Sequence, residues 1–390
     1  MAEKKINFIK IIKKKSIIFL VIIIISMYKF NKKRDNLYQI QDYLKMNLNE
    51  KLINSFDIFY KVKNPKISII ISVYNGKGYI KSAVRSIQNQ NFKDIEIIII
   101  DDFSSDDSEK VIKELMKEDP RIVFFKNKEN KGALYTKTKG ILKSKGKYVM
   151  TLDMDDLYAS EDAFSTLYDE AEKYDLDIVG FGSIINDINI LKKNIIKYNY
   201  FESPIILQPD ISKRMYIKNE NGEIKRLNNV IWCFFYKRKL FIKAIKLIEN
   251  KFLNRIMNVH DDMILFFLLT RNARKLKQIQ RIFHIVLIRP NPVDPSIIYR
   301  LKEKDKERKK NNCLAYLSYA EFLFLHTNNT YNDKEIASYE LELWFLDNEC
   351  RNNTLIRKHA LNICLLYLKN RYINNRTKEK IKTFIKECRG

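Results

Sequence analysis

Glycine, proline, cysteine and histidine are all scarce in this chain of 390 residues, with 9, 7, 5 and 4 copies respectively. The five cysteines are odd in number and form no C-x-x-C pair, which argues against a zinc ribbon or a dense disulfide framework and leaves one or two disulfides open. The four histidines are widely spaced, so an H-x-x-x-H zinc helix is absent. With 46% hydrophobic and 12% aromatic residues the chain can bury a full core, which excludes disordered, collagen-like and mini-protein classes for the whole.

Acidic residues are few relative to basic ones. The sequence has 47 Asp and Glu against 72 Lys and Arg, which gives a net charge of +25 and a pI near 9.6. Such a charge suits a nucleic-acid binder, because Lys and Arg neutralise phosphates and release counterions. A binding footprint should be concentrated in one patch, however, whereas Lys, Ile and Asn are abundant in every part of this sequence. We therefore favour a biased composition over a nucleic-acid surface.

An apolar run covers Ser16–Tyr28 (SIIFLVIIIISMY) and has lysines on both sides. As a helix it would cover roughly 20 Å of a hydrocarbon layer about 30 Å thick, so spanning would need snorkelling lysines or local thinning. Its end, Ser26-Met27-Tyr28, offers no small residue at the expected cleavage position, which favours an uncleaved anchor over a signal peptide. Six lysines precede the run and four basic residues follow it. We therefore expect a single-pass (type II) protein with a cytoplasmic N-terminus, the rest being lumenal (Golgi or ER) or extracytoplasmic.

Four regions are expected: a membrane anchor over 1–30, a polar stem over 31–64, an α/β domain over 65–295 and a helical region over 296–390. In the third region, β-branched apolar runs alternate with segments of helical spacing, which predicts a mostly parallel sheet covered by helices on both faces. We expect strands at 66–74, 95–100, 121–126, 147–152 and 177–181. We expect helices at 79–90, 134–143, 163–173, 314–325, 336–350, 355–368 and 376–388. A further helix is expected to start after Asp106, which would be its N-cap. Three N-x-T sequons (Asn328, Asn352, Asn375) arise by chance in so Asn-rich a chain and do not decide the topology.

Two acidic clusters follow predicted strands. Asp101-Asp102 come after the run IIII, and Asp153, Asp155 and Asp156 come after the strand YVMTL. Ligands bind outside the carboxyl ends of parallel strands, and a buried carboxylate pair needs a partner, a cation or water. Alternating carboxylates can hold Mg²⁺ or Mn²⁺, which then bridges to substrate phosphates. The alternative for the first cluster is helix capping in an ordinary loop.

A third acidic pair, Asp261-Asp262, opens a strongly apolar helical run (MILFFLLTRNA). Acidic side chains stabilise a helix N-terminus, so capping is the default explanation for this pair taken alone. His260 precedes the pair, and we expect it to cap the helix or pack beside it. His284 follows the helix, and the sequence assigns it no role.

Several sequence elements occur in the order and spacing of a known family. They are PKISIIISVYN (65–75), YIKSAVRSIQNQ (79–90), IIDDFSSD (99–106), NKG (130–132) followed by GKYV (146–149), and LDMDD (152–156). Downstream, Trp232 precedes Tyr236-Lys237-Arg238, and Asp261-Asp262 precede Ala273. In these elements the chain resembles the family 2 glycosyltransferases, which have the Rossmann-like GT-A fold. The resemblance covers about residues 65–290 and leaves the anchor, the stem and the C-terminal helices outside.

The resemblance implies a site for a nucleotide-sugar. Ser72 and Tyr74 would line the nucleotide pocket. Asp102, with Asp101 beside it, would read the base of the donor, for which uracil is expected.

The resemblance also implies a metal site and a base. Asp153 and Asp155 would form the D-x-D motif, in which Asp155 is a direct ligand of Mn²⁺ or Mg²⁺ and Asp153 lies toward the ribose or the waters of the metal. Asp262 would be the general base and Asp261 its support. A base must deprotonate the acceptor hydroxyl as it attacks the anomeric carbon, while the metal stabilises charge on the leaving diphosphate. The single displacement inverts the anomeric configuration.

The sequence departs from the family pattern in four places. Asp261 stands where the family commonly has Glu, and Thr-Lys-Thr at 136–138 stands where many members have Ala-Arg-Asn. No Q-x-x-R-W follows Asp262, which argues against a processive polysaccharide synthase. His284 lies where the family often has an aromatic residue.

The sequence therefore predicts a membrane-anchored, metal-dependent, inverting and non-processive glycosyltransferase of the hexosyl- or N-acetylhexosaminyl-transferase class. Its donor would be a UDP-sugar, its acceptor a glycan, a protein or a lipid-linked molecule, and nucleic acid is not an expected partner. An inactive family member that acts as a scaffold and, less favoured, a basic nucleic-acid-binding protein remain as alternatives. A dehydrogenase is excluded because no G-x-G-x-x-G follows the first strand.

Overall fold

The computed structural model describes residues 59–187, 196–198, 201–214, 216–218, 224–226, 230–257, 260–288, 306–326, 337, 341, 354–368 and 375–389. The chain divides into two compact units, Met1–Ile58 and Phe59–Gly390, and every described residue belongs to the second. The predicted anchor and most of the predicted stem therefore lie outside the described residues. Within the described ranges, no helix is long and apolar enough to cross a membrane.

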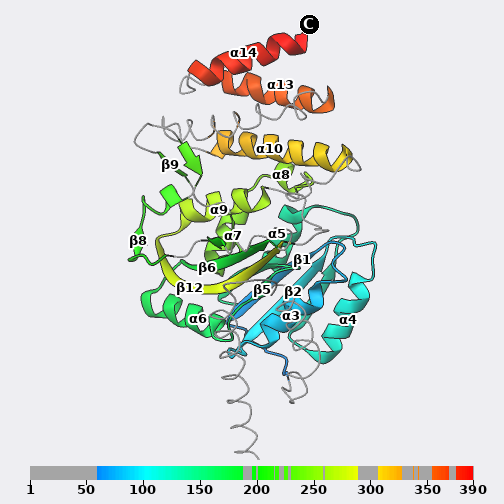
Figure 1. Ribbon diagram of the computed structural model, residues 1–390, viewed down its shortest axis with the longest axis vertical. Helices are drawn as coiled ribbons and strands as arrows, with labels where there is room; N and C mark the ends of the chain where they lie inside the picture. The colour runs from blue at the N-terminus through cyan, green and yellow to red at the C-terminus, as the bar shows by residue number, and fades with distance from the viewer. Residues whose placement is uncertain are drawn as a thin grey trace, which may run out of the picture. The chain divides into compact units, whose positions relative to one another are not determined.

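A sheet of ten strands forms the centre of the second unit (Figure 1). One half of it consists of four parallel strands in the order β3-β2-β1-β4. Isoleucines dominate β1 and β2, and almost every residue of these two strands is buried, as expected for strands covered on both faces. The four strands are β1 (Ile67–Val73), β2 (Ile95–Asp101), β3 (Ile122–Lys126) and β4 (Tyr148–Asp153).

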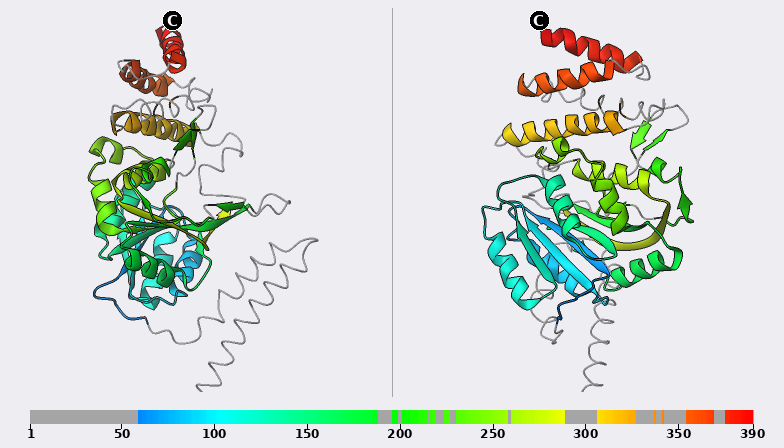
Figure 2. Two further views of the ribbon diagram at one scale, coloured as in Figure 1. Left: turned by 90° about the vertical axis from the view of Figure 1, so that its left-hand side faces the viewer. Right: turned by 180° about the vertical axis from the view of Figure 1, so that it is seen from behind.

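Helices cover both faces of this half of the sheet, as the views in Figures 1 and 2 show. They are α3 (Ile80–Gln88), α4 (Ser108–Glu118), α5 (Ala133–Lys143) and α6 (Ala163–Tyr174). Gly140 lets α5 approach the sheet closely, because a Cβ there would lie 2.4 Å from Cδ1 of Ile100. The predicted strands and helices of this half agree with the structure to within two residues. Asp106 is not the N-cap of α4; Asp107 is, because the Asp106 carboxylate accepts the Ser108 N–H and turns the chain one residue before the helix.

The other half of the sheet is mixed. Strand β11 is antiparallel to both β4 and β6, β6 is parallel to β12, and β12 is antiparallel to β5. The bounds are β5 (Leu157–Tyr158), β6 (Ile178–Asp187), β7 (Ile196–Tyr198), β8 (Ile206–Leu207), η1 (Ser212–Arg214), β9 (Tyr216–Lys218), β10 (Ile224–Arg226), β11 (Phe234–Lys237), α7 (Arg238–Ile245), α8 (Asn250–Leu253), α9 (Asp261–Asn272) and β12 (Lys275–Ile288). The predicted fold class, a mostly parallel α/β sheet with flanking helices, is confirmed.

Among the described residues, three helices follow the sheet: α10 (Lys306–His326), α13 (Thr354–Leu368) and α14 (Asn375–Arg389). Helix α10 packs on α8 and α9, where Phe322 contacts both Phe252 and Phe267 edge to face. Helix α13 packs on α10, and the Tyr367 hydroxyl donates to the carbonyl oxygen of Ala320 at 2.8 Å. The predicted helix at 336–350 lies largely outside the described residues. Cys313 is disulfide-bonded, which takes up one of the disulfides that the sequence left open.

Candidate active site

The carboxyl ends of β1 and β4 mark a topological switch point. Strand order runs outward from β1 through β2 and β3 on one side and starts again with β4 on the other, and open α/β sheets bind ligands in the crevice at such a point. The register pairs Ser72 of β1 with Asp153 of β4, and Val73 of β1 with Asp101 of β2. Tyr74 follows directly and is 42% exposed. Sequence-predicted donor-site residues from three strands therefore share one edge of the sheet.

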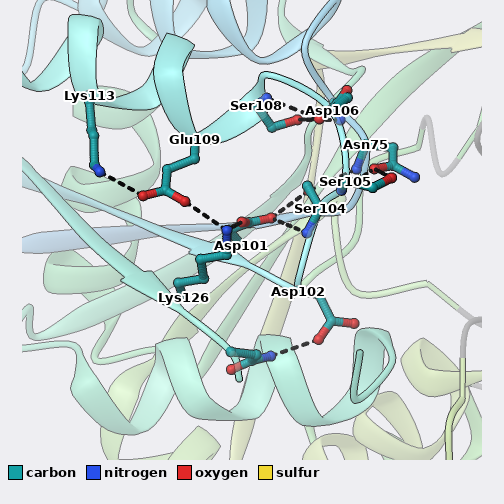
Figure 3. Close-up of polar contacts among 12 residues, drawn as sticks. Asn75, Asp101, Asp102, Ser104, Ser105, Asp106, Ser108, Glu109, Lys113 and Lys126 are labelled. Carbon is teal, nitrogen blue, oxygen red and sulfur yellow. Dashed lines mark hydrogen bonds and ion pairs between the residues drawn. The ribbon is translucent and has the colours of Figure 1, made fainter. Parts of the chain in front are cut away.

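Asp101 is fully buried at the end of β2 and serves the adjacent loop. Its Oδ1 accepts a hydrogen bond from the Ser104 backbone N–H at 3.0 Å and another from the Ser104 hydroxyl. Its Oδ2 lies 3.5 Å from Nζ of Lys126 on β3. Figure 3 shows this carboxylate between Ser104, on the loop that follows β2, and Lys126. Through these contacts Asp101 stabilises the loop that follows β2.

The Asp102 carboxylate faces a different set of donors. Oδ1 accepts hydrogen bonds from the Asn127 side chain at 2.7 Å and from the Lys131 backbone N–H at 2.9 Å, and Oδ2 accepts the Gly132 N–H at 2.8 Å. Figure 3 shows Asp102 turned away from the serine loop that Asp101 contacts. Asp102 therefore ties the end of β2 to the segment that enters α5.

The loops after β1 and β2 are hydrogen-bonded to each other. The Asn75 backbone N–H donates to the Ser104 hydroxyl at 2.9 Å, and the Asn75 side-chain oxygen accepts the Ser105 N–H at 2.9 Å (Figure 3). Asn75 and Phe103 both adopt left-handed backbone conformations, with φ of 54° and 67°. Phe103 is nevertheless 51% exposed. These loops form a fixed rim beside Tyr74 at the edge of the sheet.

The D-x-D segment lies at the end of β4. The Asp153 side chain is 37% exposed, Asp155 is half-buried and Asp156 is buried. Burial raises the pKa of Asp156, although the neighbouring His284 opposes the rise. His284 Nε2 lies 3.4 Å from Oδ2 of Asp156. The third carboxylate of the cluster thus faces the sheet interior, whereas the first two are accessible.

His284, to which the sequence assigned no role, joins several elements behind the D-x-D segment. Its imidazole is completely buried, stacks on Trp232 with ring centroids 4.7 Å apart, and places Nδ1 3.0 Å from the Ser183 hydroxyl. Trp232 belongs to the W…Y-K-R element of the sequence. The histidine therefore connects that element to Asp156.

Helix α9 begins with Asp261 and Asp262, the acidic pair that contains the predicted general base. His260 is its N-cap, with φ of 63°, and Asp261 and Asp262 form the first turn. The partial positive charge of a helix N-terminus stabilises acidic side chains there, so the capping explanation and the catalytic one are compatible. Asp262 Oδ2 accepts the Ile231 backbone N–H at 3.4 Å. Burial, together with the charges of Asp261 and Asp153, raises the pKa of Asp262 to about 8 against the opposing attraction of Lys137.

Lys137 of α5 brings the two acidic regions together. Its Nζ lies 2.8 Å from Asp262 Oδ1, 2.9 Å from Asp261 Oδ2 and 3.4 Å from Asp153 Oδ1. Burial lowers the pKa of Lys137, but the three carboxylates outweigh this effect and raise it well above the usual value. Sequence reasoning assigned Lys137 no role; its only signal was the Thr-Lys-Thr segment in place of Ala-Arg-Asn.

The donor chemistry at the end of β4 fits a divalent metal ion. Asp153 and Asp155 supply hard carboxylate oxygens, and three carboxylates share the single ammonium of Lys137, so negative charge is in excess. Mg²⁺ is commonly held by one or two carboxylates together with substrate phosphates and water. No group of three or more His, Cys, Asp or Glu side chains in the described part of the chain is arranged to hold an ion by itself.

Comparisons with known proteins show similarity to one family of glycosyltransferases. Residues 68–244 match the model of "Glycosyl transferase family 2". A Campylobacter jejuni protein named GalNAc(5)-diNAcBac-PP-undecaprenol beta-1,3-glucosyltransferase is 32% identical over 197 residues, which cover 45% of this chain and 62% of that protein. The uncharacterized glycosyltransferase EpsJ of Bacillus subtilis is 26% identical over 227 residues, or 58% of this chain and 62% of that protein. The chain thus spans about three fifths of the length of these relatives.

A solved structure shares the fold. The crystal structure of S. aureus TarS residues 1–349 in complex with UDP-GlcNAc superposes with a TM-score of 0.56 and 12% sequence identity, and the alignment covers 83% of this chain and 88% of that one. This similarity confirms the GT-A-like arrangement that the sequence predicted. Together with the family match over residues 68–244 and the glycosyltransferase relatives, it supports a glycosyltransferase of family 2.

Proposed function

We propose that this protein is an inverting, metal-dependent and non-processive glycosyltransferase that uses a UDP-sugar. The observation that carries the proposal is the convergence on Lys137 of Asp153 and of the Asp261-Asp262 pair, which are far apart in the sequence. The donor-site and base residues implied by the resemblance are thereby held together at the switch point of the sheet, where α/β folds bind nucleotides.

In the proposed reaction Asp262 acts as the general base. In its ionised form, the carboxylate accepts the proton of the acceptor hydroxyl while that oxygen forms a bond to the anomeric carbon of the donor. The bond between the anomeric carbon and the diphosphate oxygen breaks, and its electron pair leaves with UDP. Attack from the face opposite the leaving group inverts the anomeric configuration. General-base assistance of this kind is worth about 10²–10⁴-fold in rate.

The donor would bind along the edge formed by Ser72, Tyr74 and Asp102. The bound UDP-GlcNAc of TarS supports a uridine nucleotide as donor, since that protein shares the fold. Asp155, with Asp153, would hold Mn²⁺ or Mg²⁺, and such an ion, when bound, stabilises the charge that develops on the leaving diphosphate. Asp101 would contribute to donor binding indirectly, because it holds the loop that follows β2.

A lipid-linked acceptor at a membrane is the favoured partner. The Campylobacter relative is named for an undecaprenol-linked acceptor, which supports this class. The apolar run Ser16–Tyr28 would anchor the chain, and the larger number of lysines before it supports a cytoplasmic N-terminus with the catalytic domain on the other side. Protease accessibility of sealed membrane vesicles would test this orientation.

The decisive experiment measures UDP release by the full-length protein in detergent from a panel of UDP-sugars, with Mn²⁺ and with EDTA. We expect release with one or more donors, loss with EDTA, and loss in Asp262→Asn and Asp155→Ala. Asp169→Asn, at an exposed position of α6, is the matched control and should leave the rate unchanged. Equal release by wild type and Asp155→Ala would refute the metal role.

Two other outcomes would favour the alternatives. Binding of UDP-sugars without release or transfer would indicate an inactive family member that acts as a scaffold. Binding of DNA or RNA with a steep dependence on salt concentration would indicate a nucleic-acid-binding protein.

A further inference from the structure

The ammonium of Lys137 lies among three carboxylates from two separate elements. Asp153 comes from the end of β4, and Asp261 and Asp262 come from the first turn of α9, while Lys137 itself belongs to the second turn of α5. Its Nζ is 2.8 Å from Asp262, 2.9 Å from Asp261 and 3.4 Å from Asp153. The Lys137 side chain is only 7% exposed. A long flexible side chain is therefore held in one place at the point where the predicted donor and base sites meet.

Such a placement is costly for the fold. Burying an ammonium group removes its hydration, and ordering a lysine side chain costs rotamer entropy. Most lysines in the described part of the chain avoid both costs because they are exposed to solvent; Lys143, on the same helix, is one of them. The carboxylates that compensate Lys137 are the ones on which the proposed reaction depends, which points to a role in the site.

The contacts of Asp262 show what Lys137 can do for the base. Oδ1 is held by Lys137 at 2.8 Å, and Oδ2 has the longer contact of 3.4 Å with the Ile231 backbone N–H. Lys137 thus fixes the carboxylate through one oxygen and leaves the other more weakly engaged and better able to accept a proton. Because the same ammonium contacts Asp153, the position of the base is tied to the end of β4.

We propose that Lys137 is a positioning residue that orients the general base Asp262 relative to the donor site. This inference rests on the proposed function. Lysine suits the place better than arginine, because an ammonium offers three donors around one point, whereas a guanidinium presents a planar fork. The lysine at this position, where many family members have arginine, would then be a specific requirement of this site.

The test compares Lys137→Met and Lys137→Arg with the wild type, with Lys143→Met as the matched control on α5. The measurements are the kcat and KM of Mn²⁺-dependent UDP release from a UDP-sugar, the Kd of UDP, and the melting temperature. We expect kcat to fall by about 100-fold in Lys137→Met, the scale of lost general-base assistance, with KM and Kd within about threefold of wild type. Lys137→Arg should not restore kcat, and Lys143→Met should match the wild type.

Three results would overturn the proposal. A kcat of Lys137→Met within threefold of wild type would leave no role in the reaction. Raised KM and Kd with unchanged kcat would make Lys137 a ligand of the donor phosphates. Full rescue of kcat by Lys137→Arg would mean that any cation suffices.

A double variant covers the case in which Lys137→Met does not fold. Lys137→Met/Asp261→Asn removes one negative charge together with the positive one. If it is folded and its kcat falls well below that of Asp261→Asn alone, the positioning role is supported; if its kcat equals that of Asp261→Asn, Lys137 only balances charge. If the wild type releases no UDP, the proposed function itself is contradicted. If the wild type releases UDP and Lys137→Met releases it equally fast, only the role of Lys137 is contradicted.

Discussion

The carboxylate of Asp102 accepts a hydrogen bond from the backbone N–H of Gly132 at 2.8 Å, which joins the end of β2 to the start of α5. The same carboxylate accepts the Lys131 N–H and the Asn127 amide, so both of its oxygens are occupied by donors of the protein. Since α5 carries Lys137, this carboxylate also helps to determine where the ammonium lies.

Asp102→Asn should weaken both the fold and the binding of nucleotide. An asparagine NH₂ group would face donors that need an acceptor, and a buried donor left without a partner costs about 1–3 kcal/mol. We expect a fall of that size in the free energy of unfolding, measured with urea, and an increase of roughly tenfold in the Kd of UDP, which corresponds to about 1.4 kcal/mol. An unchanged Kd would contradict a contribution of Asp102 to the donor site.

Gly132→Ala should displace the entry to α5. Gly132 has φ of +83°, and a Cβ there would lie 2.7 Å from the Met257 backbone nitrogen. Alanine would introduce backbone strain and a clash with rigid main chain, for a cost of order 1–3 kcal/mol. Gly78→Ala is the matched control, because a Cβ at Gly78 meets nothing within 4 Å. Thermal melts of both variants test the prediction, and equal melting temperatures would contradict it.

The pKa of Asp262, raised to about 8 from its ordinary value of 3.8, predicts a pH dependence of stability. Between these two pH values the folded state holds a proton at this carboxyl that the unfolded chain has lost. The contribution of Asp262 to the free energy of unfolding should therefore fall as pH rises through this window.

The measurement is the melting temperature of wild type and Asp262→Asn from pH 5 to 8.5. The wild type should lose stability relative to the variant as the pH rises, because asparagine does not titrate. Parallel pH profiles of the two proteins would show that the carboxyl has an ordinary pKa.

Tyr316→Ala should lower activity through α10. The Tyr316 ring contacts the His260 ring with centroids 3.8 Å apart, and His260 is the N-cap that precedes Asp261 and Asp262. Loss of such a ring contact costs about 0.5–1.5 kcal/mol. Because a small displacement of a catalytic group is costly, we expect kcat of UDP release to fall at least about tenfold. Leu365→Ala, at a 38% exposed position on α13, should leave kcat unchanged.

The sequence by itself determined the first half of the fold. Continuous apolar runs such as ISIIISV and IEIIII can only be buried on both faces of a sheet, and the helical spacing between them leaves a parallel arrangement. Of the second half, only the start of β6 and the helix opened by Asp261-Asp262 were predicted. Strand β12 was missed because it mixes charged and apolar residues (KLKQIQRIFHIVLI) and pairs with β6, about one hundred positions away. Short strands such as β5 and β11 form only in the presence of their neighbours, so local pattern did not reveal them.

The sequence also singled out the acidic residues of the candidate site, because carboxylates at the ends of apolar strands require a partner. Tertiary structure decided which partners they have. It turned Asp101 toward Ser104, surrounded Asp102 with donors from the segment before α5, and placed Asp156 beside His284. Above all it brought Lys137 to Asp262, 125 positions away. No local pattern encodes that contact, because it depends on how the ends of α5, β4 and α9 meet after folding.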